Sequence, residues 1–230
     1  MNRTQSDVAQ SIDHHQVSFG NEFIRKGIHL CSLSMPILYY FIPQSTALQI
    51  IIPVTLAALT LDVLKFFHKP TFDLYHKLFG QILRTHEKGE SKKTLNGASW
   101  VLISATFCVL VFPKIIAITA FAILIISDTF AALIGRRFGT KKYRDKTVEG
   151  STAFILSAFV VILFTPKVAH LPGEYLFAFI AAIIGAISEI FSFDIIDDNF
   201  AIPVSIGFTL WFFYWFFLPE LNVYALEAMR

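Results

Sequence analysis

Seven apolar runs, each about as long as a membrane-crossing helix, constrain this chain more than any other feature. Such a helix needs about 20 mostly apolar residues, with a range of roughly 17–25. Hydrophobic residues make up 55% of the chain and charged residues 16%, against roughly 45–50% and 25% in ordinary globular proteins. We therefore expect an all-α, polytopic membrane protein with about seven transmembrane helices, and we exclude a disordered or nucleic-acid-binding chain. The runs lie at about 27–43, 45–67, 95–112, 114–134, 150–166, 175–191 and 200–218.

The basic residues predict the orientation of these helices. Lys and Arg close to a membrane concentrate on its cytoplasmic side. With a cytoplasmic N-terminus, 16 of the 19 Lys and Arg residues fall on that side. We expect a multi-pass integral membrane protein whose active site also faces the cytoplasm. Residues 1–20 are predicted to form a polar tail without a cleaved signal peptide, and residues 21–230 a single membrane-embedded domain.

The first long polar loop, at 68–94, contains apolar residues at helical spacing. This spacing predicts a short helix, either in the cytoplasmic membrane interface or packed on neighbouring loops. Neither interpretation assigns chemistry to the helix. The residues are Phe72, Tyr75, Phe79, Ile82 and Leu83.

A second polar loop, at 135–149, follows a charged residue inside the fourth apolar run. Asp128 lies about two helical turns before this loop, and a charge within a span usually marks a functional site. Gly135 and Gly150 permit close backbone approach, and a helix beginning at Gly150 would offer N–H groups to an anion. Arg136 and Lys146 supply positive charge. The pattern favours a phosphate site over an ordinary basic loop, which would not explain Asp128 or the glycines.

Carboxylates cluster in a third segment, at 192–203. Asp194, Asp197 and Asp198 fall within five residues, in a stretch without Lys or Arg. Carboxylate oxygens of this kind suit Mg²⁺ shared with substrate phosphates, although a solvated acidic turn is about equally compatible with this segment alone. Two other polar residues have alternative roles. Asn96 could contact the nucleotide or cap a helix, and its residue type at this position favours the cap. His29 is either a phosphate contact or an interfacial side chain.

Five motifs follow one another from residue 22 to about residue 207. They are Glu22-x-x-Arg25-Lys26-x-x-His29, Leu95-x-Gly97-Ala98-x-Trp100, Asp128-x-x-Ala131-x-x-x-Gly135-Arg136-x-Phe138-Gly139, Lys146-Thr147-x-Glu149-Gly150-Ser151 and Asp197-Asp198-Asn199-x-x-Ile202-Pro203. Together they resemble the polyprenol kinase family, which includes phytol kinase, dolichol kinase and the CTP-dependent diacylglycerol kinase. The third and fourth motifs are shared with phosphatidate cytidylyltransferases, whereas the fifth resembles the kinases.

The resemblance implies transfer of the terminal phosphate of CTP to the hydroxyl of an isoprenoid alcohol or diacylglycerol, with Mg²⁺ as cofactor. The residues implied in catalysis are Asp128, Arg25, Lys26, Lys146 and Glu149. Those implied in nucleotide binding are Asn96, Gly135, Arg136, Lys146, Gly150 and Asn199. The implied metal ligands are Asp128, Asp197 and Asp198, with Asp194 as a further candidate.

The expected partners are CTP, a membrane lipid alcohol and the lipid bilayer, and a homo-oligomer is compatible with the sequence. Two alternatives stay open. The first is a CTP-using cytidylyltransferase that acts on a lipid phosphate. The second is a small transporter or channel, which would spread its functional carboxylates across the depth of the bilayer. The sequence does not decide which lipid alcohol is phosphorylated, or whether CTP or another nucleotide is the donor.

Overall fold

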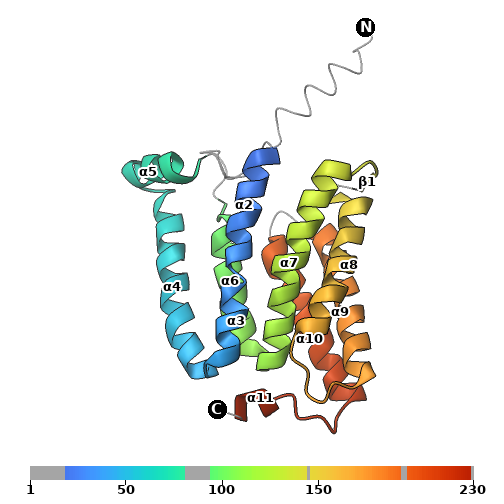
Figure 1. Ribbon diagram of the computed structural model, residues 1–230. Helices are drawn as coiled ribbons and strands as arrows, with labels where there is room; N and C mark the ends of the chain where they lie inside the picture. The colour runs from blue at the N-terminus through green and yellow to red at the C-terminus, as the bar shows by residue number, and fades with distance from the viewer. Residues whose placement is uncertain (1–18, 81–93, 144–145, 193–195, 229–230) are drawn as a thin grey trace.

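The computed structural model describes residues 19–80, 94–143, 146–192 and 196–228, which form a bundle of roughly parallel and antiparallel helices (Figure 1). The regular structure of these residues is helical apart from one short hairpin. The elements are α2 (Phe19–Cys31), α3 (Ser34–Phe41), α4 (Gln44–Leu64), α5 (Lys69–Phe79), α6 (Gly97–Val111), α7 (Lys114–Phe138), β1 (Lys142–Tyr143), β2 (Lys146–Thr147), α8 (Val148–Phe164), α9 (Pro172–Phe191), α10 (Asp198–Phe217) and α11 (Ala225–Ala228).

Each predicted apolar run corresponds to helical structure, but the first run is divided into α2 and α3. Pro36 explains the division, because proline lacks an N–H and its ring clashes with the carbonyl four residues earlier. That carbonyl belongs to Ser32, which instead accepts a bond from the N–H of Met35 at 2.9 Å. The expectation of one continuous helix over 27–43 was therefore wrong.

Four of the described helices, α4, α7, α9 and α10, are long and apolar enough to cross a membrane. Helices α6 and α8 are apolar but shorter, with 15 and 17 residues. A multi-pass membrane protein is thus supported, while the number of seven spans stays a prediction.

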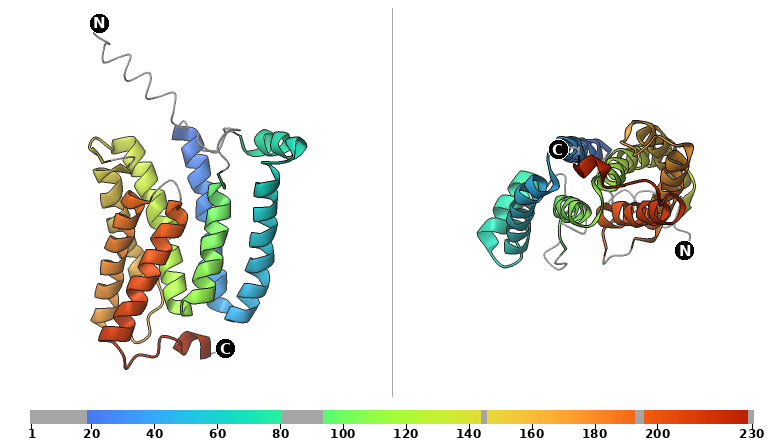
Figure 2. Two further views of the ribbon diagram at one scale, coloured as in Figure 1. Left: turned by 180° about the vertical axis from the view of Figure 1, so that it is seen from behind. Right: turned by 90° about the horizontal axis from the view of Figure 1, so that it is seen from below.

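Helix α7 is the centre of the bundle and packs against α2, α3, α6, α8 and α10. Of its most apolar 18 residues, 83% are buried inside the protein, whereas the corresponding share for α4 is 17%. Both views in Figure 2 place α4 at the edge of the bundle, where it packs on α6. A helix that is apolar all round belongs in a core or in a membrane. The burial of α7 agrees with a core position, and the exposure of α4 agrees with a membrane-facing position.

The predicted loop at 135–149 is more ordered than expected. Helix α7 continues to Phe138, and β1 and β2 then pair as an antiparallel hairpin. Two arginines in the last turn of α7 favour this continuation, because positive side chains complement the negative end of the helix dipole. Helix α8 begins at Val148, two residues before the predicted start, because the hydroxyl of Thr147 caps it by accepting a bond from the N–H of Gly150 at 3.1 Å.

The predicted helix in the first long loop is present as α5, which lies across one end of the bundle (Figure 1). The start of α2 and the hairpin lie at the same end, and α11 lies at the opposite end. Of the residues that predicted α5, Ile82 and Leu83 lie outside the described part of the chain. The polar elements singled out from the sequence therefore share one end of the molecule.

Candidate active site

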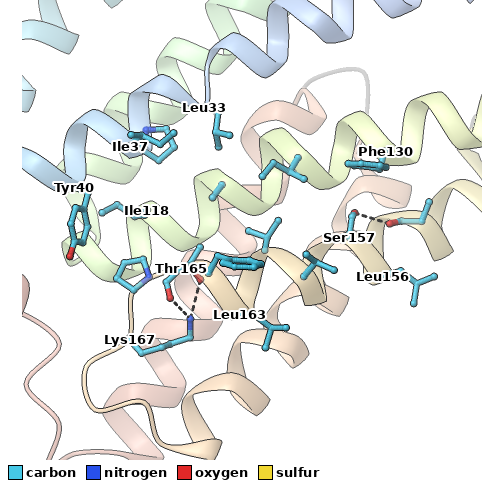
Figure 3. A pocket seen from close by; sticks show the side chains of 18 of the residues that line it. Leu33, Ile37, Tyr40, Ile118, Phe130, Leu156, Ser157, Leu163, Thr165 and Lys167 are labelled. Atoms are coloured by element: carbon cyan, nitrogen blue, oxygen red, sulfur yellow. Dashed lines mark hydrogen bonds between the residues drawn. The ribbon is translucent and has the colours of Figure 1, made fainter.

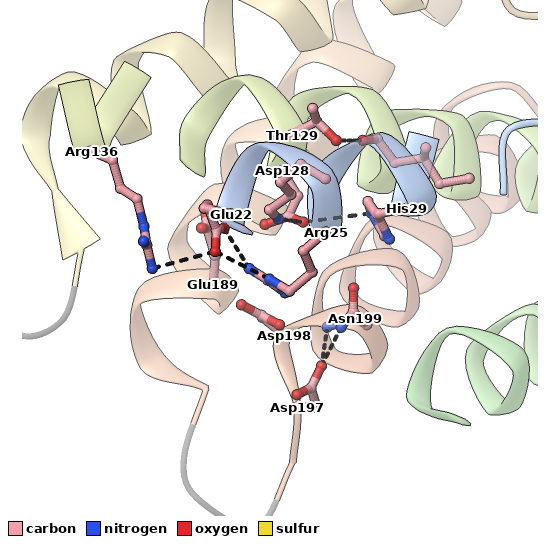
Figure 4. A network of polar contacts seen from close by, with 12 residues as sticks. Glu22, Arg25, His29, Asp128, Thr129, Arg136, Glu189, Asp197, Asp198 and Asn199 are labelled. Carbon is pink, nitrogen blue, oxygen red and sulfur yellow. Dashed lines mark hydrogen bonds and ion pairs between the residues drawn. The ribbon is translucent and has the colours of Figure 1, made fainter. Parts of the chain in front are cut away.

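Three carboxylates from three different helices converge at this end of the bundle. Asp128 comes from α7, Glu189 from α9 and Asp198 from the first turn of α10. One oxygen of each lies within 4.8 Å of the others, and Asp128 and Glu189 are buried. Figure 4 shows the three side chains pointing toward one another. Such a group repels itself unless cations compensate it.

Two lysines supply part of that compensation. Lys26 of α2 is 3% exposed and donates a hydrogen bond to Asp128. Lys146 of β2 reaches the other two carboxylates, with its Nζ 2.6 Å from Glu189 Oε1 and 3.0 Å from Asp198 Oδ2. Burial opposes the charged form of Lys146, but the carboxylates of Asp198 and Glu189 outweigh it and raise the pKa of Lys146 above its ordinary value. Lys146 therefore carries its positive charge throughout the physiological pH range.

Two arginines share a single buried carboxylate beside this cluster. Glu22 is 2% exposed and accepts hydrogen bonds from Arg25, with Nε at 3.2 Å and Nη2 at 2.5 Å. Arg136, in the last turn of α7, places its Nη2 3.3 Å from Glu22 Oε2, the oxygen that also accepts the bond from Arg25 Nε. Figure 4 shows Glu22 between the two guanidinium groups. Glu22 thereby fixes both arginines near the N-terminal end of α2.

His29 adds a further group to the cluster. Its Nε2 lies 3.5 Å from Asp128 Oδ2, and its side chain is only 10% exposed. This nitrogen is buried and makes no hydrogen bond to any residue that the structure describes. The structure thus places His29 beside the central carboxylate.

The two predicted phosphate-loop glycines bring α7 and α8 together. A Cβ added to Gly135 would lie 2.7 Å from Thr147 Oγ1 and 3.3 Å from the Cα of Gly150. A Cβ on Gly150 would lie 2.9 Å from the carbonyl oxygen of Ala131. The close approach observed here is therefore between two helices, and it lies next to Lys146, whose side chain enters the carboxylate cluster.

Asn96 occupies the capping position that the sequence favoured. Its Oδ1 accepts a bond from the N–H of Ser99 at 2.8 Å, and its Nδ2 donates to the hydroxyl of Tyr75 in α5. Its own N–H donates to Asp62 Oδ2 at 2.8 Å, and Asp62 pairs with Lys65 at 2.5 Å. This second polar group ties α4, α5 and α6 together.

The remaining predicted residues have local partners. Asp197 caps α10, because its Oδ1 accepts bonds from the backbone N–H and the side-chain amide of Asn199, at 3.0 and 2.5 Å. Glu149 accepts bonds from the N–H and the hydroxyl of Thr140. Asp194 lies outside the described residues.

Among the predictions made from the sequence, Glu189 had no role, and Glu22 was only a motif position. The available signal for Glu189 was a carboxylate inside an apolar helix, which is costly without a function. The available signal for Glu22 was its position three residues before Arg25, a spacing that allows an ion pair within one helical turn.

These features describe a helical protein with apolar helices long enough to cross a membrane and a site built around three carboxylates. Comparison with known proteins narrows the class of protein. No family model matches the chain, and no solved structure matches it. It is 32% identical over 164 residues to the CTP-dependent diacylglycerol kinase 1 of Schizosaccharomyces pombe, covering 64% of this chain and 72% of that protein. The chain therefore belongs to the family of CTP-dependent diacylglycerol kinases.

Two other relatives extend over more of the chain. The CTP-dependent diacylglycerol kinase 1 of Saccharomyces cerevisiae is 25% identical over 225 residues, which cover 87% of this chain and 71% of that protein. An uncharacterized protein of Rickettsia prowazekii is 28% identical over 188 residues, covering 81% of this chain and 92% of that protein. The similarity thus includes most of the helical bundle.

Proposed function

We propose that this protein is a CTP-dependent lipid kinase that transfers the terminal phosphoryl group of CTP to the hydroxyl of a lipid alcohol. The observation that carries the proposal is the convergence of Asp128, Glu189 and Asp198 with two lysines, in a chain whose relatives are named CTP-dependent diacylglycerol kinases. We propose diacylglycerol or an isoprenoid alcohol as the acceptor. The proposed orientation puts the cluster on the cytoplasmic face, where the nucleotide is dissolved.

The charges of the cluster suit a Mg²⁺ ion that accompanies a nucleotide. Three carboxylates and the ammonium groups of Lys26 and Lys146 leave one net negative charge. Hard carboxylate oxygens are the ligands that Mg²⁺ prefers, usually together with substrate phosphates. We propose that Asp128, Glu189 and Asp198 hold the ion, which would neutralise charge on the phosphates. Asp197 was the ligand expected in place of Glu189, and its capping bonds to Asn199 favour Glu189.

The basic side chains around the cluster are proposed to bind the phosphates. Phosphoryl transfer depends mainly on positioning and on stabilising charge that is spread over phosphate oxygens. Arg25 and Arg136 are held together by Glu22, and guanidinium groups match phosphate geometry. Lys146 and Lys26 supply point charges next to the carboxylates. Gly135 and Gly150 act by setting the position of Lys146, and Asn96 and Asn199 stay predicted nucleotide contacts.

In the proposed reaction, the acceptor oxygen forms a bond to the terminal phosphorus of CTP while the bond from that phosphorus to its bridging oxygen breaks. CDP leaves with the electron pair of the broken bond. The hydroxyl proton passes to a carboxylate, for which Asp128 and Glu149 are the two predicted candidates. Arg25 and Arg136 stabilise the negative charge that develops on the leaving phosphate.

Isotopic labelling tests the proposal. Purified protein is incubated with diacylglycerol, phytol or a long polyprenol and with CTP labelled at either the gamma or the alpha phosphate. A kinase places gamma label on the lipid, and ATP as donor gives less product than CTP. Alpha label on the lipid would instead show a cytidylyltransferase and contradict the proposal. Asp128→Asn should abolish transfer, whereas Asp73→Asn, on the exposed face of α5, is the matched control and should retain it.

A further inference from the structure

A large apolar groove lies along the outside of the central helix, between α3, α7 and α8 (Figure 3). Its volume is about 1530 Å³, and it follows α8 from Glu149 at one end to the loop residue Lys167 at the other. Helix α8 has 17 residues, so the groove is about 25 Å long at 1.5 Å per residue. Between its ends the lining is almost entirely aliphatic and aromatic.

The groove and the carboxylate cluster lie on opposite faces of α7. The groove floor contains Ala122, Ile126, Phe130 and Ile134, which recur every four residues along one face. Asp128 lies two positions from Ile126 and from Phe130, and a step of two residues turns about 200° around a helix. The groove therefore does not open onto Asp128 through α7.

The start of α8 connects the two faces. The side chain of Lys146 enters the carboxylate cluster, and Glu149, three residues later, lines the groove. Three residues of extended chain span at most about 11 Å. The mouth of the groove is thus within about this backbone distance of a residue that contacts two carboxylates of the site.

The two ends of the groove differ in what they offer a ligand. At the far end, Lys167 donates to Ile162 O, Thr165 O and Thr165 Oγ1, at 2.8, 2.8 and 3.0 Å, so its three protons are used. At the near end, Oε1 of Glu149 accepts both bonds from Thr140. Oε2 of Glu149 is buried and makes no hydrogen bond to any described residue. The Glu149 end therefore holds a carboxylate oxygen without a hydrogen-bond donor within 3.5 Å among the described residues, and a ligand reaches this oxygen when the Glu149 side chain turns toward the groove.

We propose that this groove binds the hydrocarbon chain of the acceptor alcohol and that Oε2 of Glu149 accepts the hydrogen bond of its hydroxyl. This inference rests on the proposed function and names the lipid subsite. A long apolar groove with a carboxylate at one end matches a molecule that has a long hydrocarbon chain and a hydroxyl group at its head. Glu149 then contacts the acceptor hydroxyl directly, three residues along the chain from Lys146.

Photolabelling locates the lipid independently of turnover. The probe is a diacylglycerol with a diazirine in one acyl chain, added to the full-length protein in detergent without CTP and mapped by mass spectrometry. Label is expected on α3, α7 and α8 residues of the groove. Label confined to other helices would overturn the inference even if phosphoryl transfer from CTP is observed. Failure of the kinase proposal is read separately, as absence of gamma label on the lipid.

Two matched substitutions test whether filling the groove excludes the lipid. Val160 lines the groove and is 53% exposed, whereas Val54 on α4 is 49% exposed and lies outside it. Val160→Trp should lower photolabelling and raise the KM for the alcohol at least about tenfold, with kcat changed less. Val54→Trp should leave the photolabelling and the KM for the alcohol near the values of the parent protein. Equal effects of the two substitutions, or none from Val160→Trp, would contradict the proposal.

The role of Glu149 is tested with two competitors of the photolabel. One is diacylglycerol, and the other is its methyl ether, which cannot donate a hydrogen bond. In the parent protein the alcohol should compete for photolabelling about tenfold better than the ether, since a hydrogen bond to a charged group is worth roughly a factor of ten or more. Glu149→Gln should reduce this preference while groove labelling persists. An unchanged preference in that variant would refute the assignment of the hydroxyl to Glu149.

Discussion

Replacing Asp128 by asparagine should cost stability as well as activity, and the reason is its pairing with Lys26. Both residues are 3% exposed, and they join α2 to α7. Removing one partner of a buried ion pair leaves an uncompensated charge and costs about 3–5 kcal/mol. Asparagine still offers an amide oxygen to the ammonium group, so we expect a loss near the lower value, about 3 kcal/mol. For a chain of this size that corresponds to a fall in Tm of roughly 6–12 °C.

A second substitution separates the structural role from the chemical one. The double variant Asp128→Asn with Lys26→Met removes the buried ammonium group that Asp128→Asn leaves without its carboxylate, and replacing both members of a buried pair is often nearly neutral. The double variant should therefore be more stable than Asp128→Asn, although it transfers no phosphate. Stability is measured by thermal unfolding in detergent and activity with gamma-labelled CTP. Asp73→Asn, on the exposed face of α5, is the control and should change stability by less than about 0.5 kcal/mol.

Two results would refute this reasoning. One is a Tm for Asp128→Asn equal to that of the Asp73→Asn control, which would mean that the pair with Lys26 contributes nothing. The other is a double variant less stable than Asp128→Asn, which would mean that Lys26 stabilises the fold through other contacts. Phosphoryl transfer by the stable double variant would separately contradict the proposed metal-binding role of Asp128.

Three further predictions concern metal binding, the contact between α7 and α8, and the buried Lys167. EDTA should abolish phosphoryl transfer, and Glu189→Gln should weaken Mn²⁺ binding, followed by electron paramagnetic resonance, more than Asp197→Asn does. Gly150→Ala should lower stability by about 1–3 kcal/mol, because its Cβ would lie 2.9 Å from a carbonyl oxygen of α7. Gly173→Ala, with its nearest contact at 3.7 Å, should cost nothing measurable in the same unfolding assay. Burial lowers the pKa of Lys167 from 10.5 to about 8. The unfolded chain therefore binds the proton of the Lys167 ammonium group more tightly than the folded chain does. Stability should then rise with pH between about 8 and 10.5, and Lys167→Met should remove that rise in thermal scans.

Sequence reasoning succeeded where the information is local to one helix. The lengths of the apolar runs predicted the helices, since a helical stretch is recognisable from its own composition. Asn96 was favoured as a cap, and its bond to the N–H of Ser99 confirms this. The division of the first run at Pro36 was also readable in principle, because proline interrupts the hydrogen bonding of its own helix. The prediction of a span over about 27–43 rested on the apolar length of that run, which does not show where a helix is divided.

Sequence reasoning was incomplete where side chains from distant segments must meet. Asp197 and Asp198 are neighbours in the chain, yet only Asp198 joins the cluster of described carboxylates, because adjacent residues at the start of a helix point in different directions. Glu189 joins it from another helix, and its place depends on how α9 is rotated against α7 and α10. Rotation of packed helices is decided by the interlocking of their side chains, which no single segment encodes.

The sequence by itself determined that the chain is helical, suited to a membrane and charged mainly at one end, because apolar length and the placement of Lys and Arg are properties of the chain. It also contained the motifs that resemble lipid kinases. Only the tertiary structure decided which charges meet. It joined Lys26 to Asp128 across 102 positions and Lys146 to Glu189 across 43, and it put the apolar groove on the opposite face of α7. Those relations arise from the packing of whole helices against one another, and therefore depend on all of their contacts at once.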